Sequence, residues 1–190
     1  MSARTILERV DENLYILRVD DLDVRYFEAI WEIPEKITYN AYLLLEDDHR
    51  VLFDGWKGSY SEQFLELIRS LIDPRDLTHL VVHHVEPDHS GSLPRVLEAN
   101  GFRAVVLTHP MAVTMLKQIY KIEARFRPVK DGEEIRIGDR VLKFVHTPWL
   151  HWPETIMSLL TDRLILFSGD AFGGYSIPSS IFDDSEEVVA

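Results

Sequence analysis

One short stretch of the sequence concentrates side chains that bind metal ions. His84, Glu86, Asp88 and His89 place two imidazoles and two carboxylates within six residues. Alternate side chains of an extended backbone point the same way, so His84, Glu86 and Asp88 are predicted to face a common centre. His89 leaves that line and is predicted to serve a second metal nearby. A solvated polar loop is the alternative interpretation, but a ligand set this dense favours a metal site.

A second candidate ligand, His151, lies in a turn between two predicted strands. A lone histidine in such a turn is more often structural, but its neighbours favour a ligand. Pro148 and Pro153 stiffen the backbone on both sides. Trp149 and Trp152 are predicted to shield the site from water, and Phe172, further along the chain, is expected to contribute to the same wall. The surroundings therefore make His151 a candidate metal ligand.

Two aspartates follow apolar strands and offer further carboxylates. Asp170 comes after the apolar run 164–167, in a glycine-rich turn that allows close approach of backbone. On local grounds an Asx-turn residue is an equally good interpretation of Asp170. Asp54 ends the run 51–53 and is interpreted as a turn carboxylate or a support for the ligands. His83 is predicted to point away from His84, to the opposite face.

Composition narrows the classes of partner. The chain of 190 residues has 32 acidic and 20 basic residues, a net charge of −12, and no cysteine. Negative charge repels phosphate backbones and anionic lipid, so neither nucleic acid nor membrane is an expected partner. Lack of cysteine excludes disulfides, iron–sulfur clusters and thiolate zinc sites. No apolar run approaches the ~20 residues that span a bilayer, and no signal peptide is visible, so we expect a cytoplasmic protein.

The hydrophobic periodicity changes twice along the chain and predicts an α/β fold. The beginning and the end have the short apolar runs of antiparallel strands, whereas the middle alternates helices with buried strands. This order predicts two packed sheets with helices outside. The acidic residues 183–187 are predicted to begin another helix. The expected strands are 14–17, 24–27, 42–45, 51–53, 80–82, 104–107, 135–137, 141–145, 156–160 and 164–167, and the expected helices are 64–72, 93–100 and 110–120.

Taken together, these segments resemble the flavodiiron proteins (A-type flavoproteins) of the metallo-β-lactamase superfamily. Flavodiiron proteins have glutamate at the second ligand position of the first motif, where the superfamily has histidine, and Glu86 occupies that position here. The resemblance spans nearly the whole chain and its motifs are specific. The matching segments are 37–42, 52–54, 84–92, 150–153 and 167–173.

The resemblance implies a metallo-β-lactamase-like αββα four-layer sandwich that carries two non-haem irons. It assigns His84, Glu86 and His151 to one iron, Asp88 and His89 to the other, and Asp170 to a bridge between them. A nitrogen and carboxylate set without thiolate suits iron that binds O2 at open positions. Glutamate in place of histidine should favour ferric iron and lower the potential. No catalytic residue beyond these ligands is expected, and no residue is assigned to a further cofactor.

The sequence departs from the family pattern in two ways. The family's last ligand is a histidine well beyond the position of Asp170, and no histidine follows His151 in this chain. We therefore interpret residues 1–190 as one di-iron domain that is incomplete in its second half. The flavodoxin-like FMN domain of the family, with its phosphate-binding loop, is not visible either. FMN is expected only on a partner domain or subunit, in a head-to-tail homodimer, with a flavin or rubredoxin-type electron donor.

Three functions are compatible with the motifs. The first is an oxidoreductase that detoxifies O2 by reduction to water, or NO by reduction to N2O. The second is a di-iron sensor that binds O2 without turnover, which residues 27–34 favour because they are similar to stand-alone members of the family. The third is a metal-dependent hydrolase that uses a metal-activated hydroxide. Glu86 counts against the hydrolase, because hydrolases of the superfamily keep histidine there.

Overall fold

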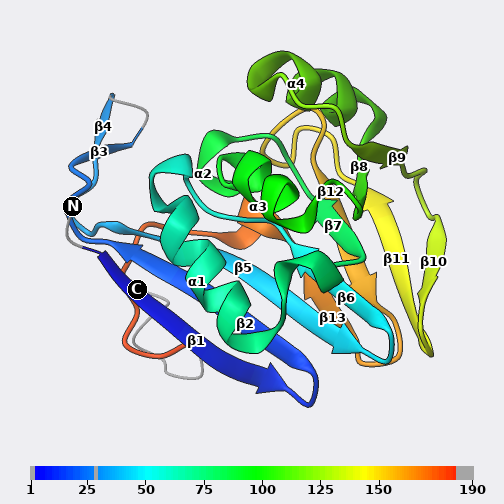
Figure 1. Ribbon diagram of the computed structural model, residues 1–190. Coiled ribbons are helices and arrows are strands. Elements are labelled where there is room, and N and C mark those ends of the chain that lie inside the picture. The colour runs from blue at the N-terminus through cyan, green and yellow to red at the C-terminus, as the bar shows by residue number, and fades with distance from the viewer. Residues whose placement is uncertain (1–2, 28–29, 183–190) are drawn as a thin grey trace.

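The computed structural model describes residues 3–27 and 30–182, and the predicted helix start at 183–187 lies outside them. Two sheets pack face to face, and three helices cover one of them (Figure 1). The larger sheet has the strand order β1-β2-β5-β6-β7-β8-β9, and the smaller has the order β10-β11-β12-β13. No helix of the described part of the chain is long and apolar enough to cross a membrane.

The larger sheet is antiparallel in its first half and parallel in its second. Pairs from β1 to β6 are antiparallel, whereas β6, β7, β8 and β9 pair in parallel. The change of period in the sequence therefore marks the change of strand direction. The strands are β1 (Ala3–Asp11), β2 (Leu14–Asp21), β5 (Ile37–Glu46), β6 (His49–Phe53), β7 (His79–Val82), β8 (Val105–Thr108) and β9 (Arg125–Pro128).

Three amphipathic helices pack on the outer face of the larger sheet. They are α1 (Ser61–Leu71), α3 (Leu93–Asn100) and α4 (Pro110–Tyr120). Each buries an apolar stripe in the same core, including Phe64, Val96 and Leu116. Gly101 ends α3 with a left-handed φ of 70°, which glycine adopts at little cost. All three predicted helices are confirmed.

The smaller sheet covers the other face and closes the sandwich. It consists of β10 (Glu134–Ile137), β11 (Arg140–His146), β12 (Ile156–Leu160) and β13 (Ile165–Phe167). A second core between the sheets joins Phe53 and Val81 of the larger sheet to Phe144 and Leu160 of the smaller. The α/β prediction is confirmed. Within residues 3–27 and 30–182 the layers are helix, sheet and sheet, and no helix covers the outer face of the smaller sheet.

Several elements differ from the prediction. Of the predicted strand 24–27 only β3 (Tyr26–Phe27) forms, and it pairs with β4 (Trp31–Glu32) in a small hairpin that projects from the body (Figure 1). The edge strands β1 and β9 were not predicted, because edge strands carry charged residues that weaken the apolar pattern. The segment that follows Glu86 is a helical turn, α2 (Pro87–Ser90).

Candidate metal centre

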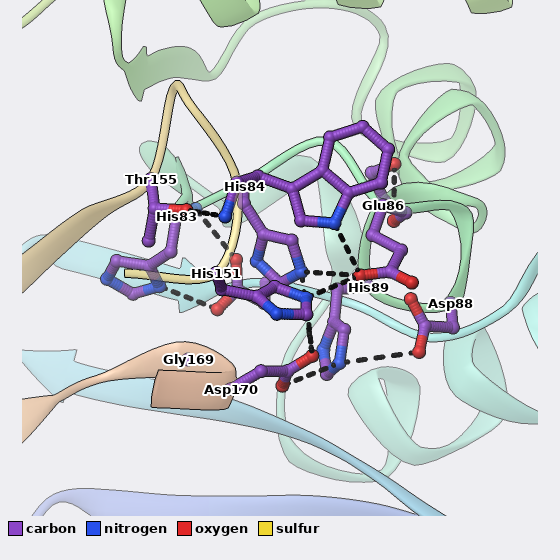
Figure 2. A network of polar contacts seen from close by, with 12 residues as sticks. His83, His84, Glu86, Asp88, His89, His151, Thr155, Gly169 and Asp170 are labelled. Atoms are coloured by element: carbon purple, nitrogen blue, oxygen red, sulfur yellow. Dashed lines mark hydrogen bonds and ion pairs between the residues drawn. The ribbon is translucent and has the colours of Figure 1, made fainter. Parts of the chain in front are cut away.

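The candidate ligands gather where several elements end at one edge of the sandwich. His84 and Glu86 lie in the loop after β7, and Asp88 and His89 lie on α2. His151 comes from the turn between β11 and β12. Asp170 lies on η3 (Gly169–Phe172), the short 3-10 helix after β13. Figure 2 shows their side chains converging on one volume. Open α/β sheets usually have their functional sites beyond the carboxyl ends of parallel strands. Here His84 and Glu86 lie just beyond the carboxyl end of β7.

Four of these residues form the first group of potential ligands. His84, Glu86, His151 and Asp170 each offer an atom to a common position, with all four atoms within 4.8 Å of one another. His151 Nε2 lies 2.6 Å from Glu86 Oε2 and 3.6 Å from Asp170 Oδ2. His84 Nε2 lies 3.5 Å from Glu86 Oε2. Ligand atoms about 2.1 Å from one metal lie roughly 3.0–3.5 Å apart, so the two longer spacings are close to those around a metal ion. The 2.6 Å contact between His151 and Glu86 is a hydrogen bond.

A second group lies beside the first and shares His84. Its members are His84, Asp88 and His89, again within 4.8 Å. His89 Nε2 is 3.7 Å from Asp88 Oδ2 and 3.0 Å from Asp170 Oδ1. The two oxygens of Asp170 thus face different groups: Oδ2 faces His84 and His151, whereas Oδ1 faces His89. One carboxylate therefore lies between the two groups.

An extended backbone is predicted over the whole of the first motif, but in the structure it is extended only as far as Glu86. It turns into α2 at Pro87, which occupies the first turn of the helix, where a missing N–H costs nothing. Ser90 secures the turn, because its Oγ donates to the carbonyl oxygens of Val85 and Glu86 at 2.9 Å. The prediction that Asp88 shares a line with the preceding ligands is therefore wrong. The helical turn carries Asp88 to the side of His89 instead.

Mutual charge neutralisation governs the protonation of His89 and Asp170. Burial alone would lower the pKa of His89, but its hydrogen bond to Asp170 and the nearby carboxylates raise that pKa to about 10. Burial alone would raise the pKa of Asp170, but His89, followed by His84 and His151, lowers that pKa to about 2. Without a metal these residues therefore hold one another as an ion pair. A bound cation would take the place of the proton on His89.

The other two carboxylates respond in opposite directions. Burial tends to raise the pKa of Glu86, but the nearby imidazoles of His84 and His151 lower it overall. Burial, with the like charges of Glu86 and Asp170, raises the pKa of Asp88. A group of carboxylates that repel one another in a buried pocket is stabilised by a cation, because the cation compensates the shared negative charge.

Several polar atoms of the candidate ligands are buried without a hydrogen bond. They include both ring nitrogens of His84, Oδ1 of Asp88 and Nδ1 of His89. Buried polar groups without partners are rare in folded proteins, and an ion at the site is one of the explanations for them. These atoms, and a donor set made of imidazole nitrogen and carboxylate oxygen, fit a metal ion at this place.

A cavity of about 370 Å³ opens beside the candidate ligands. Asp88, His89, His151 and Asp170 line one side of it. The rest of the lining is partly aromatic and includes Phe27, Tyr42, Phe167 and Tyr175. A small molecule that enters this cavity meets the candidate ligands directly.

Asp54 supports the ligand loop and is not in either group of potential ligands. Its Oδ1 accepts from the backbone N–H of His83 at 2.9 Å, and its Oδ2 lies 2.6 Å from His83 Nδ1. The other ring nitrogen of His83 lies 2.8 Å from Ser158 Oγ on β12. His83 therefore points into the layer between the two sheets, away from His84, as predicted. The resulting chain of hydrogen bonds ties the start of the loop to both sheets.

The predicted aromatic wall forms only in part. Trp149 is 78% exposed and Phe172 is 77% exposed, so neither shields the site in this chain. Trp152 is half-buried, and its indole N–H donates to Glu86 Oε2 at 2.9 Å. A hydrophobic role was predicted for Trp152, but its polar edge supports a candidate ligand. Sequence alone does not distinguish these roles, because both place a tryptophan beside the ligand.

The turn around His151 holds an uncommon backbone conformation. His151 has a φ of 117° and Trp149 a φ of 66°, although neither is glycine. Such conformations cost on the order of 1–3 kcal/mol each and concentrate at functional sites. The hydrogen bond from the Trp149 N–H to the Trp152 carbonyl, at 2.9 Å, closes the turn. Rigidity was predicted from the flanking prolines, and the strained conformation of His151 was not.

Comparison with known families identifies the domain. The family model described as ODP family beta lactamase matches residues 37–189. The chain belongs to this family. A mutant of the flavo di-iron protein from Thermotoga maritima has a solved structure that is similar over 100% of the chain, with a TM-score of 0.94 and 44% identity. The fold is thus the metallo-β-lactamase-like fold of the di-iron domain of flavodiiron proteins, as the motifs predicted.

Curated relatives with named activities are also similar. The rubredoxin-oxygen oxidoreductase of Megalodesulfovibrio gigas is 32% identical over 93% of this chain and 44% of its own length. The nitric oxide reductase of Moorella thermoacetica is 32% identical over 92% of this chain and 44% of its own length. The Thermotoga maritima structure is covered over 48% of its chain. The chain therefore spans less than half the length of these relatives.

Proposed function

We propose that this domain holds a pair of non-haem irons. His84, Glu86 and His151 hold one iron, Asp88 and His89 hold the other, and Asp170 bridges the two. The observation that carries the proposal is the orientation of Asp170, whose two oxygens face the two groups of potential ligands. A bridging carboxylate neutralises both cations at once, and two-metal centres are built around such shared ligands.

Iron is supported over other metals by the chemistry of the donor set. All six side chains offer imidazole nitrogen or carboxylate oxygen, and no thiolate is available because the sequence has no cysteine. Histidine with carboxylate is the set that non-haem iron proteins use to bind oxygen. Glu86 adds an anionic oxygen that stabilises the ferric state. The same glutamate argues against a zinc hydrolase, in which histidine would occupy this position.

The function that this centre supports best is reduction of O2 or NO for detoxification. Bound iron supplies the electrons and the open positions at which such a diatomic molecule binds. The cavity of about 370 Å³ admits a molecule of this size beside His89 and Asp170. Relatives named rubredoxin-oxygen oxidoreductase and nitric oxide reductase support both substrates.

We further propose that the electrons come from outside this chain. Two ferrous ions provide two electrons, whereas reduction of O2 to water takes four, so turnover requires resupply from another redox group. A flavodoxin-like FMN domain on a partner subunit of a homodimer, or a rubredoxin-type protein, is the proposed donor. The exposed rings of Trp149 and Phe172 beside the centre support this, because they offer a surface on which a donor can dock.

The test is gas consumption by the iron-loaded chain, with and without a flavin donor. Protein loaded with ferrous iron under anaerobic conditions is mixed with O2, or with NO, in the presence of a reduced flavodoxin. We expect sustained consumption with the donor, and without it no more than the two electrons of one diferrous centre allow, which is half an equivalent of O2 reduced to water or two equivalents of NO reduced to N2O. Asp170→Asn, which keeps the size of the side chain but removes its charge, serves as the control. Binding of O2 without sustained consumption, even with the donor, would favour an oxygen sensor over an enzyme.

A further inference from the structure

A buried carboxylate next to the metal centre has no part in either group of potential ligands. Glu154 is fully buried, with 0% of its surface exposed. Its Oε1 accepts a hydrogen bond from the backbone N–H of Val85 at 3.0 Å. Its Oε2 is also buried and has no hydrogen-bond partner. Burial of a carboxylate costs free energy, and here a single backbone N–H compensates it, so retention of the carboxylate calls for an explanation.

The position of Val85 supplies that explanation. Val85 lies between His84 and Glu86, and both of these residues belong to the first group of potential ligands. The N–H of Val85 lies in the peptide unit that joins His84 to Val85, so it cannot turn without changing ψ of His84 and φ of Val85. An acceptor that fixes this N–H therefore fixes the directions in which His84 and Glu86 leave the backbone. Residues of this kind, one bond removed from the ligands, set the geometry of metal sites in proteins.

The hydrogen bond to Glu154 is one of three that join residues 152–156 to residues 83–86. The N–H of Ile156 donates to the carbonyl of His83 at 2.9 Å, and the indole of Trp152 donates to Glu86 at 2.9 Å. With the bond from Val85 to Glu154, every second residue of 152–156 thus holds a residue of 83–86. The segment that carries His151 is in this way paired with the segment that carries His84 and Glu86. Among these three contacts, only the one from Val85 ends on a buried carboxylate that belongs to neither group of potential ligands.

We propose that Glu154 is a positioning residue that fixes the ligand loop through Val85 and so sets the geometry of the first metal position. The inference rests on the proposed metal centre. It concerns chiefly the position formed by His84, Glu86 and His151, because His84 and Glu86 both flank Val85, whereas the second group shares only His84 with the loop and takes Asp88 and His89 from α2. Loss of the acceptor should therefore weaken one metal position more than the other.

Two substitutions of similar size separate acceptance of the hydrogen bond from mere filling of space. Glu154→Gln keeps an oxygen that accepts from Val85 and removes the charge, whereas Glu154→Met fills the same volume and accepts nothing. Titration of the metal-free proteins with cobalt(II), followed by its visible absorption, reports affinity and coordination geometry together. We expect Glu154→Gln to bind like the unmodified chain. Glu154→Met should bind the first cobalt roughly 10- to 100-fold more weakly and with an altered spectrum.

A matched control removes a buried carboxylate far from the centre. Glu46 is 6% exposed and pairs with Arg140 at 3.0 Å, away from the candidate ligands. Glu46→Met should lower the stability to urea but leave cobalt affinity and spectrum unchanged. The pair distinguishes a local effect on metal geometry from a general effect of destabilisation.

The possible outcomes distinguish failure of the role proposed for Glu154 from failure of the proposed metal centre. Cobalt binding by Glu154→Met that equals the unmodified chain would overturn the role of Glu154, as would equal losses in the Gln and Met variants. If the unmodified chain binds no cobalt, the proposed metal centre itself is wrong, and this inference with it. If Glu154→Met does not fold, the rate of hydrogen exchange at the Val85 amide still tests the proposal in the unmodified chain and in Glu154→Gln. Strong protection in the unmodified chain and in Glu154→Gln is expected, and rapid exchange in both would contradict the proposal.

Discussion

The two sides of the metal centre differ in how firmly the fold holds them. The ligand loop and α2 lie in the interior: His84 is completely buried, and Glu86, Asp88 and His89 are at most 8% exposed. On the other side, the side chains of His151 and Asp170 are 32% and 29% exposed. The first side follows a strand of the larger sheet, whereas the second comes from a strained turn and a short 3-10 helix.

This difference indicates that the core preforms one side and leaves the other open. The ligand loop is fixed through Asp54, Glu154 and Ser90, which form hydrogen bonds with the backbone of residues 83 and 85. The turn of His151 and the helix of Asp170 border the cavity and carry exposed aromatic rings. The proposed function would need such an accessible side, because a gas must reach the centre and electrons must be supplied to it. We therefore expect substitutions on the two sides to have different consequences.

The largest expected effect is on the residue that joins the two sides. Asp170→Ala should weaken binding of both metals by well over ~100-fold, beyond the loss that supporting residues cause, because both groups lose a ligand. His89→Ala should weaken only the second metal. Iron content after dialysis is the measurement, with Asp162→Ala as a control because Asp162 pairs with Arg140 on the surface. Equal losses in the Asp170 and His89 variants would show that Asp170 is not the bridge.

Replacement of two tryptophans, one buried and one exposed, should show how differently the interior and the open side contribute to the free energy of unfolding. Trp56 is 0% exposed, its backbone N–H donates to Ser92 Oγ at 2.9 Å, and its indole donates to the Leu17 carbonyl. Trp56→Ala should lower the free energy of unfolding by about 3–5 kcal/mol, since it leaves a large cavity. Trp149→Ala should change it by no more than about 0.5 kcal/mol, as expected for an exposed residue. Urea denaturation of both variants measures this, and similar losses would contradict the difference between the sides.

A more moderate effect is expected where the two sides touch. Trp152→Phe removes the hydrogen bond from the indole to Glu86 Oε2 but keeps an aromatic ring. Metal affinity should fall by about 10-fold, the lower end of the range for groups that support ligands. Trp31→Phe, in the exposed β3–β4 hairpin, is the control and should leave affinity unchanged. Isothermal titration with cobalt(II) decides between them, and an unchanged affinity in Trp152→Phe would mean that its hydrogen bond is dispensable.

The smallest expected effect lies at the opposite ends of the same strands. His79 stacks on His49, with ring centroids 6.0 Å apart, and burial, followed by the charge of His49, lowers its pKa from 6.5 to about 4. The folded state thus resists protonation that the unfolded chain accepts. Stability from this residue is complete above about pH 6.5 and is lost as the pH falls toward about 4.

His79→Gln should abolish this part of the pH dependence. The difference between variant and unmodified chain is expected to be on the order of 1 kcal/mol, reduced from the full shift because His79 is partly exposed. Urea denaturation at about pH 7 and about pH 4.5 gives the two free energies of unfolding for each protein. The prediction fails if both proteins lose the same stability between those pH values. Metal binding should be unaffected by the substitution.

The core and the candidate ligands could be predicted from the sequence because both leave strong local patterns. The apolar run 80–82 and the helix 110–120 follow ordinary periodicities, and both form as predicted. The segment 84–89 is recognisable because it contains four potential metal ligands in six residues, and the structure brings these four together. The edge strand β9 escaped prediction because Arg125–Pro128 is polar, as edge strands are.

Features that depend on contacts between distant segments could not be predicted in the same way. Pro87 is a sequence signal for the helical turn α2, because proline favours the first position of a helix, but the alternation of ligands over residues 84–88 predicts an extended strand instead. Glu154 and Trp152 gain their roles only because residues 152–156 lie against residues 83–86. No spacing in the sequence reveals that pairing. Exposure of Trp149 likewise depends on what covers the turn.

The identity of the bound metal tests the central claim most directly. The chain is produced in medium with balanced iron and zinc, purified without chelators, and analysed by elemental mass spectrometry. The account predicts iron as the bound metal, approaching about two per complete centre, because the donor set is histidine with carboxylate and includes Glu86. Stoichiometric zinc with no iron would contradict the proposed di-iron centre.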